Sequence, residues 1–208
     1  GRQVFRQHPG ELIDASRTAV ADALSQLPAK DRGSICAISV DTTGSSPTAI
    51  GPDALPLALT GEFENNADAM MILWKDHSSE AEADELERAL GEPYSSEWFW
   101  AKVLAARRRD PELAEAAVTW AEQADWFPAF LCGNRMPESW RRCRSGASHK
   151  ALWRPGLGYP SAALLGSVDP YLADLRQTLG EEAWSPETRF GELGEEEGSL
   201  LGLPAGLP

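Results

Sequence analysis

The sequence predicts an α/β fold, and three observations support this prediction. A long stretch near the start repeats apolar residues at helical spacing. Residues 35–40 form a short, almost continuous apolar run rich in β-branched residues, which is typical of a buried strand. Further helical segments then flank a second strand-like run at 70–74. Helical and strand patterns that alternate in this way are characteristic of α/β domains.

The first helix is expected over 10–27, where proline at 28 stops it. Its apolar positions are Leu12, Ala15, Ala19, Ala23 and Leu27. The strand at 35–40 is expected to be buried and parallel, with Cys36 as a small core residue. The Gly/Ser/Thr loop at 41–47 would then lie at the carboxyl end of this strand, where open α/β sheets bind ligands. An ordinary turn is the alternative interpretation of that loop.

The middle of the chain predicts a strand followed by two helices. The strand at 70–74 precedes an acidic helix at 80–90, for which a serine provides the N-cap. The serine pair 95–96 introduces the next helix. The arginine triplet 107–109 is expected to end it, because cations there complement the helix dipole.

The last part of the chain predicts short helices between turns. Asp110-Pro111 is a helix start signal for a segment through Ala121. Residues 125–133 are expected to form a short buried helix that ends at a glycine. The acidic run 192–197 is expected to be a solvated loop.

Length, charge and cysteine content exclude several classes of protein. The 208 residues are enough for one large domain or two small ones. A net charge of −13 argues against a nucleic-acid partner. No run is apolar enough to span a membrane and no signal sequence opens the chain, so a cytoplasmic location is expected. The three cysteines are too scattered for a disulfide framework or a zinc site.

Two segments, 72–77 and 145–153, each place tryptophan beside charged or titratable side chains. Aromatic rings pack against the C–H faces of sugars, while lysine, aspartate and histidine reach the hydroxyl groups. The two segments therefore indicate a pocket for a small polyhydroxylated molecule. The alternative is that Trp74 and Trp153 are core residues with charges that merely flank them.

Recognisable motifs lie in six segments of the chain, 40–47, 72–77, 95–102, 125–126, 145–153 and 164–170. In this order they resemble the ribulokinases of the FGGY carbohydrate-kinase family. The Ser-Ser-Glu-Trp and His-Lys-Ala-Leu-Trp sequences are specific to ribulokinases within the family. The resemblance implies an incomplete actin-like, ribonuclease-H-like kinase N-terminal domain with inserted helices.

The resemblance also implies an activity and a set of sugar-binding residues. Such kinases transfer the γ-phosphoryl group of ATP to the 5-hydroxyl of L-ribulose, assisted by Mg²⁺, in arabinose catabolism. By this resemblance Trp74 forms a wall of the sugar pocket and Lys150 donates to sugar hydroxyls, with Asp76, Ser45 and Ser46 nearby. Tyr94 falls where a glycerol-phosphorylating branch of the family has a substrate-contacting tyrosine.

The same resemblance indicates what residues 1–208 lack. The opening phosphate-binding strands, the catalytic aspartate and the C-terminal nucleotide domain of the family have no counterpart in this sequence. Residues 1–208 are therefore expected to be a partial N-terminal, sugar-binding domain without a catalytic residue or a metal ligand. We expect this chain alone to use neither ATP nor Mg²⁺ and to be inactive.

Two other interpretations remain open at this stage. The chain could be a non-catalytic module that binds L-ribulose, a related ketose or a protein partner, or a piece without function. Without the opening strands, the strand at 35–40 would have an unpaired edge, and such edges pair with other chains. Self-association is therefore a further expectation.

Overall fold

The computed structural model describes residues 4–208, which form a mixed α/β structure with short strands. The helices are α1 (Pro9–Gln26), α2 (Glu80–Leu90), α3 (Phe99–Arg109), α4 (Pro111–Ala116), α5 (Gln123–Leu131), α6 (Arg144–Ala151), α7 (Ala162–Gly166), α8 (Pro170–Thr178) and α9 (Glu195–Leu201). The strands are β1 (Arg6–Gln7), β2 (Pro47–Ile50), β3 (Met71–Ile72), β4 (Thr119–Glu122), β5 (Arg142–Cys143) and β6 (Ala183–Trp184).

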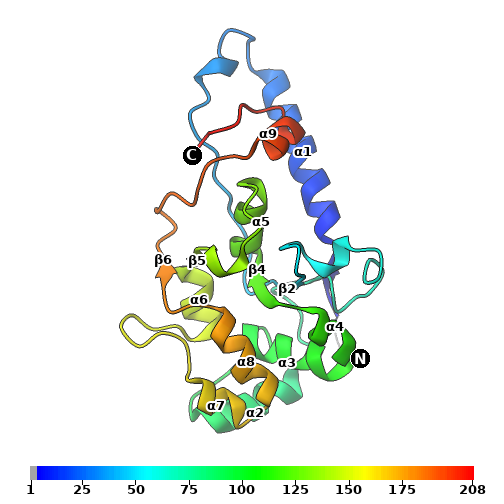
Figure 1. Cartoon of the computed structure of the whole chain (residues 1–208), viewed down its shortest axis with the longest axis vertical. Helices are drawn as coiled ribbons and strands as arrows, with labels where there is room; N and C mark the ends of the chain where they lie inside the picture. The colour runs from blue at the N-terminus through cyan, green and yellow to red at the C-terminus, as the bar shows by residue number, and fades with distance from the viewer. Residues whose placement is uncertain (1–3) are drawn as a thin grey trace.

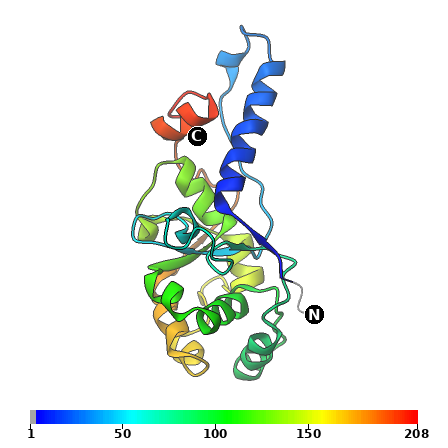
Figure 2. The same ribbon diagram turned by 90° about the vertical axis from the view of Figure 1, so that its right-hand side faces the viewer.

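The strands pair into small two-stranded sheets that lie in the middle of an elongated molecule (Figure 1). β1 pairs with β3 and β2 pairs with β4, both antiparallel, whereas β5 and β6 are parallel. Helix α1 runs beside α9 at one end, as the blue and red helices show in both views (Figures 1 and 2). Helices α2, α3, α7 and α8 gather at the other end.

The pair β2–β4 separates two hydrophobic clusters. Successive side chains of a strand point to opposite faces, so Ala49 and Trp120 belong to the larger cluster around α3. Their neighbours Ile50 and Ala121 belong to the smaller cluster around α5. All four side chains are fully buried. The strand pair therefore contributes buried side chains to both clusters.

Several predicted elements are confirmed, with small shifts at their ends. Helix α1 ends at Gln26, just before the proline at 28, and α2 matches the predicted 80–90 helix. Helix α3 ends on the arginine triplet as expected. Helix α5 covers most of the predicted 125–133 helix. The predicted strand at 70–74 is present as the two residues of β3.

The prediction of a buried parallel strand at 35–40 was wrong. This segment has no strand pairing in the described structure and runs as an irregular chain. Cys36 is exposed and is not a core residue. The apolar side chains of Ile35, Ile38 and Val40 are only half buried, against the smaller cluster. Sequence composition alone does not form a strand, because a strand also needs a partner for its backbone groups.

Two further predictions need correction. The helix expected from Pro111 through Ala121 ends at Ala116, and Thr119–Glu122 is strand β4 instead. The β-branched and aromatic residues of this stretch fit a pleated strand, and pairing with β2 outweighs the helix start signal. The acidic run 192–197 is not a solvated loop throughout. Its last three residues begin α9, and Glu197 is buried and bonded to Arg135.

None of the helices within residues 4–208 combines the length and the apolar character that crossing a bilayer requires.

Candidate functional site

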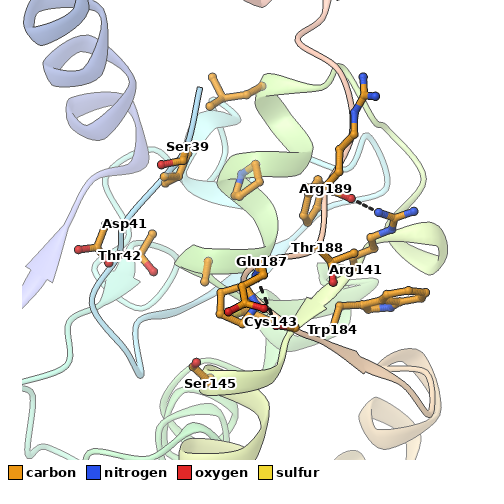
Figure 3. Close-up of a pocket in the computed structure, with 18 of the residues that line it drawn as sticks. Ser39, Asp41, Thr42, Arg141, Cys143, Ser145, Trp184, Glu187, Thr188 and Arg189 are labelled. Carbon is orange, nitrogen blue, oxygen red and sulfur yellow. Dashed lines mark hydrogen bonds between the residues drawn. The ribbon is translucent and has the colours of Figure 1, made fainter. Parts of the chain in front are cut away.

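A cavity of about 640 Å³ lies between the irregular segment 37–44, the α5–β5–α6 region and the loop 184–191 (Figure 3). Cavities of this size suit small-molecule ligands. In Figure 3, Ser39, Asp41 and Thr42 lie along one side, and Arg141, Trp184 and Thr188 lie along the other. The guanidinium of Arg141 packs over the Trp184 ring, 4.9 Å from its centroid.

Helix α6 presents its polar face to this cavity. Ser145, Gly146, His149 and Lys150 all line it, and their spacing of three and four residues places them on one side of the helix. Of the residues predicted to bind a sugar, Lys150 is the one that lines the cavity. Its side chain is half buried, so its ammonium can reach a ligand from the wall.

Trp153 and Tyr94 anchor α6 and do not line the cavity. Trp153 is buried, and its indole N–H donates to the carbonyl of Glu181 at 2.9 Å. This is the core role that was the alternative interpretation. The hydroxyl of Tyr94 donates to the Lys150 carbonyl at 2.9 Å and accepts from the Trp100 amide at 3.1 Å. Burial raises the pKa of Tyr94 well above its usual value. Tyr94 therefore holds the end of α6, beside Lys150.

Ser45 and Ser46 are fully buried behind the cavity wall. The wall itself is formed by the preceding residues, including Thr42 and Gly44. The Ser45 hydroxyl donates to the Glu122 carboxylate, and the Ser46 amide donates to its other oxygen at 2.6 Å. The loop predicted as a ligand site thus borders the cavity, although its two serines face the protein.

Trp74 and Asp76 are not among the residues that line the cavity. The Trp74 side chain is 47% exposed. Asp76 is fully buried, and its oxygens accept from the Phe5 amide, the Arg6 guanidinium and the Ser78 amide and hydroxyl. Although burial opposes ionisation, these hydrogen bonds and the Arg6 charge lower the pKa of Asp76. A contact of either residue with a sugar stays a prediction.

Two buried charged residues that sequence analysis missed hold the cavity wall. Lys102 on α3 is 1% exposed and donates to the carbonyls of Ser45 and Leu73, both at 2.8 Å. Glu122 ends β4 and lines the cavity. Burial lowers the pKa of Lys102 to about 8 and raises that of Glu122 to about 7. A sequence signal for Lys102 exists, because it is a single cation within an otherwise apolar stretch of helix.

Comparison with known proteins now gives the family. A ribulokinase from Vibrio parahaemolyticus is 38% identical over 216 residues, which cover 98% of this chain and 38% of that protein. A ribulokinase from Bacillus licheniformis is 30% identical and is matched over 96% of this chain and 37% of its own length. The chain belongs to the FGGY carbohydrate-kinase family. It spans less than two fifths of the length of these relatives. No family model matches it.

Solved structures of two sugar kinases share the fold. A xylulose kinase from Rhodospirillum rubrum superposes with a TM-score of 0.74 at 19% identity, over 99% of this chain and 40% of that one. A gluconate kinase from Lactobacillus acidophilus gives a TM-score of 0.70 at 15% identity, also over 99% and 40%. These matches confirm the predicted α/β fold class.

The ionisation of Glu122 in this FGGY-family chain predicts a pH dependence of stability. Its folded pKa of about 7 exceeds the ordinary value of 4.5. The folded chain therefore binds more protons than the unfolded chain between these values, and the free energy of unfolding falls as pH rises through them. Between about pH 5 and about pH 7 the free energy of unfolding should therefore decrease by roughly 2 kcal/mol more in the wild type than in the Glu122→Gln variant, as measured by urea unfolding. Parallel pH profiles for the variant and the wild type would contradict this.

Proposed function

We propose that this chain forms part of the N-terminal, sugar-binding domain of a kinase that phosphorylates L-ribulose. The observation that carries the proposal is that Lys150 lines a small-molecule cavity together with Thr42 and Gly44, in a chain homologous to ribulokinases. Transfer of the ATP γ-phosphoryl group to the 5-hydroxyl of the sugar would then be the activity of the whole protein.

The cavity wall has the chemistry that a ketose requires. The Lys150 ammonium carries three N–H donors, and the hydroxyls of Thr42 and Ser145 both donate and accept. Ala124 and Pro128 supply apolar wall opposite the C–H groups of a sugar. Phosphoryl transfer asks mainly for positioning and for stabilisation of charge, so residues that hold the acceptor sugar contribute directly to the rate.

The residues of this chain would hold the sugar and not the nucleotide. Within residues 4–208, no group of three or more His, Cys, Asp or Glu side chains is arranged to hold a metal ion. We assign no step to Mg²⁺ or ATP here. The role of this chain in the reaction is to bind and orient the acceptor.

Calorimetric titration of the 208-residue chain with L-ribulose tests the proposal. We expect binding to the wild type, and a loss of about tenfold or more in affinity for Lys150→Ala, because a hydrogen bond to a charged group is removed. Trp74→Ala tests separately whether the exposed indole also contacts the sugar.

The matched control is Lys30→Ala, which removes an exposed lysine that does not line the cavity. Its affinity should equal that of the wild type. Absence of ribulose binding to the wild type, or equal affinity for Lys150→Ala and the wild type, would count against the proposal.

A further inference from the structure

The Lys102 ammonium links two segments that are distant in sequence. It lies between the carbonyl of Ser45 and the carbonyl of Leu73, each 2.8 Å away, with the Ile72 carbonyl at 3.5 Å. Within residues 4–208 it forms no ion pair, so its contacts are made to backbone oxygens. Its hydrogen bonds therefore fix the position of the backbone, and its charge also interacts with the nearby Glu122 carboxylate.

Glu122 forms hydrogen bonds with the same loop. Its carboxylate accepts from the Ser45 hydroxyl and from the Ser46 amide. Ser45 is thus held by Lys102 through its carbonyl and by Glu122 through its hydroxyl. Glu122 also packs against α6, because a Cβ placed at Gly146 would lie 3.4 Å from the Glu122 Cγ. A small side chain at position 146 would therefore be in van der Waals contact with Glu122.

Two buried charges are a costly way to hold a loop if stability is the only gain. Burying an ammonium and a carboxylate costs several kcal/mol each. A protein in which apolar residues of similar volume replace such charges is often no less stable. Both side chains are at least nine-tenths buried. Their shared feature is that they hold the residues immediately after Thr42–Gly44, the part of the loop that lines the cavity.

We propose that Lys102 and Glu122 are positioning residues for sugar binding, because together they fix the cavity-lining loop and tie it to the end of β3. Lys102 does not line the cavity and acts through the Ser45 and Leu73 carbonyls. Glu122 lines the cavity, and its positioning role is the pair of hydrogen bonds that it accepts from Ser45 and Ser46. The effect on sugar binding rests on the proposed function. The hydrogen bonds of Lys102 and Glu122 that hold the loop, called the clamp below, can be measured without a ligand.

The first experiment uses Lys102→Met in the 208-residue chain, since methionine keeps an unbranched buried side chain without the donor. Hydrogen exchange of backbone amides should accelerate both at 42–46 and at 72–76, and the affinity for L-ribulose should fall about tenfold or more, because the wall is no longer held in place. A purely structural role would lower stability throughout without a local gain in exchange at these two segments.

The matched control is Arg176→Met. Arg176 is also a buried cation that donates to backbone carbonyls, those of Pro160 and Gly180, and it does not line the cavity. This variant should bind L-ribulose as the wild type does and should leave exchange at 42–46 unchanged. Equal loss of affinity in both variants would overturn the proposal.

Glu122→Leu keeps the test decisive if Lys102→Met does not fold. Leucine accepts neither of the two hydrogen bonds that the carboxylate accepts, so exchange of the Ser46 amide should accelerate. Unchanged exchange at 42–46 in every folded variant would overturn the clamp. Absence of ribulose binding to the wild type would instead refute the proposed function, and the exchange data would still decide whether the clamp exists.

Discussion

Trp100→Ala is expected to lower the free energy of unfolding by about 3–5 kcal/mol, because it removes a large, fully buried side chain from a packed core. Trp100 lies on α3, with ring centroids 5.1 Å from Phe99 and 6.4 Å from Tyr159. Its indole N–H donates to the Ala151 carbonyl at the end of α6, 3.0 Å away. The variant therefore leaves a cavity and an unpaired carbonyl next to Lys150. Urea unfolding of the purified chain measures the loss.

Two control variants separate size from chemistry. Trp100→Phe keeps most of the ring and removes the N–H, so its loss should be about 1–3 kcal/mol, the cost of a buried acceptor without a partner. Trp74→Ala removes the same side chain from an exposed position and should cost less than about 1 kcal/mol. Similar losses for Trp74→Ala and Trp100→Ala would contradict the burial that the structure assigns to these tryptophans.

Arg142→Met is expected to cost about 3–5 kcal/mol at neutral pH, because it leaves a buried carboxylate without its cation. Arg142 donates to the Trp120 carbonyl at 3.0 Å, and its guanidinium lies 3.5 Å from the Asp125 carboxylate. Asp125 also accepts from the Cys143 amide at 2.7 Å. The variant therefore disrupts the junction between β4, α5 and β5 that frames the cavity.

The pH dependence of this variant follows from Asp125. Burial raises the pKa of Asp125, and the Arg142 charge opposes that rise. Without Arg142 the pKa should rise further, and a raised folded pKa means that stability is lost as pH increases through it. The deficit of Arg142→Met should therefore be largest at neutral pH and shrink as pH falls toward 3.8, the ordinary value.

A double-mutant cycle with Asp125→Asn checks the assignment. The double variant carries neither charge and should recover part of the loss of Arg142→Met. Arg17→Met removes an arginine from an exposed pair with Asp14 and should cost less than about 1 kcal/mol. A deficit of Arg142→Met that is the same at every pH would show that the buried Asp125 charge is not its cause.

Local patterns were sufficient for most helices. Helix α1 follows from its apolar spacing and from the proline that stops it. Helix α2 is capped by Gly91, whose φ of 71° suits glycine. The residues after Pro111 show where such patterns fail. A start signal at Asp110 does begin α4, but β2 lies ready to pair with Thr119–Glu122, and no local pattern contains that partner. For the same reason the strand-like composition of 35–40 does not make a strand.

The candidate site also combines features that the sequence predicts with features that only the tertiary structure determines. The sequence by itself determined the family, the choice of Lys150 as a sugar-site candidate and the polar loop at 41–47, because these depend on motifs and on short-range composition. Only the tertiary structure decided that Lys150 and the loop share one cavity. It also decided that Trp74 lies outside the cavity lining, that Lys102 holds the wall from behind and that Glu122 lines the cavity while it binds the same loop. The physical reason is that burial and hydrogen bonding of a charged side chain depend on segments far apart in the chain, which meet only when the two cores pack.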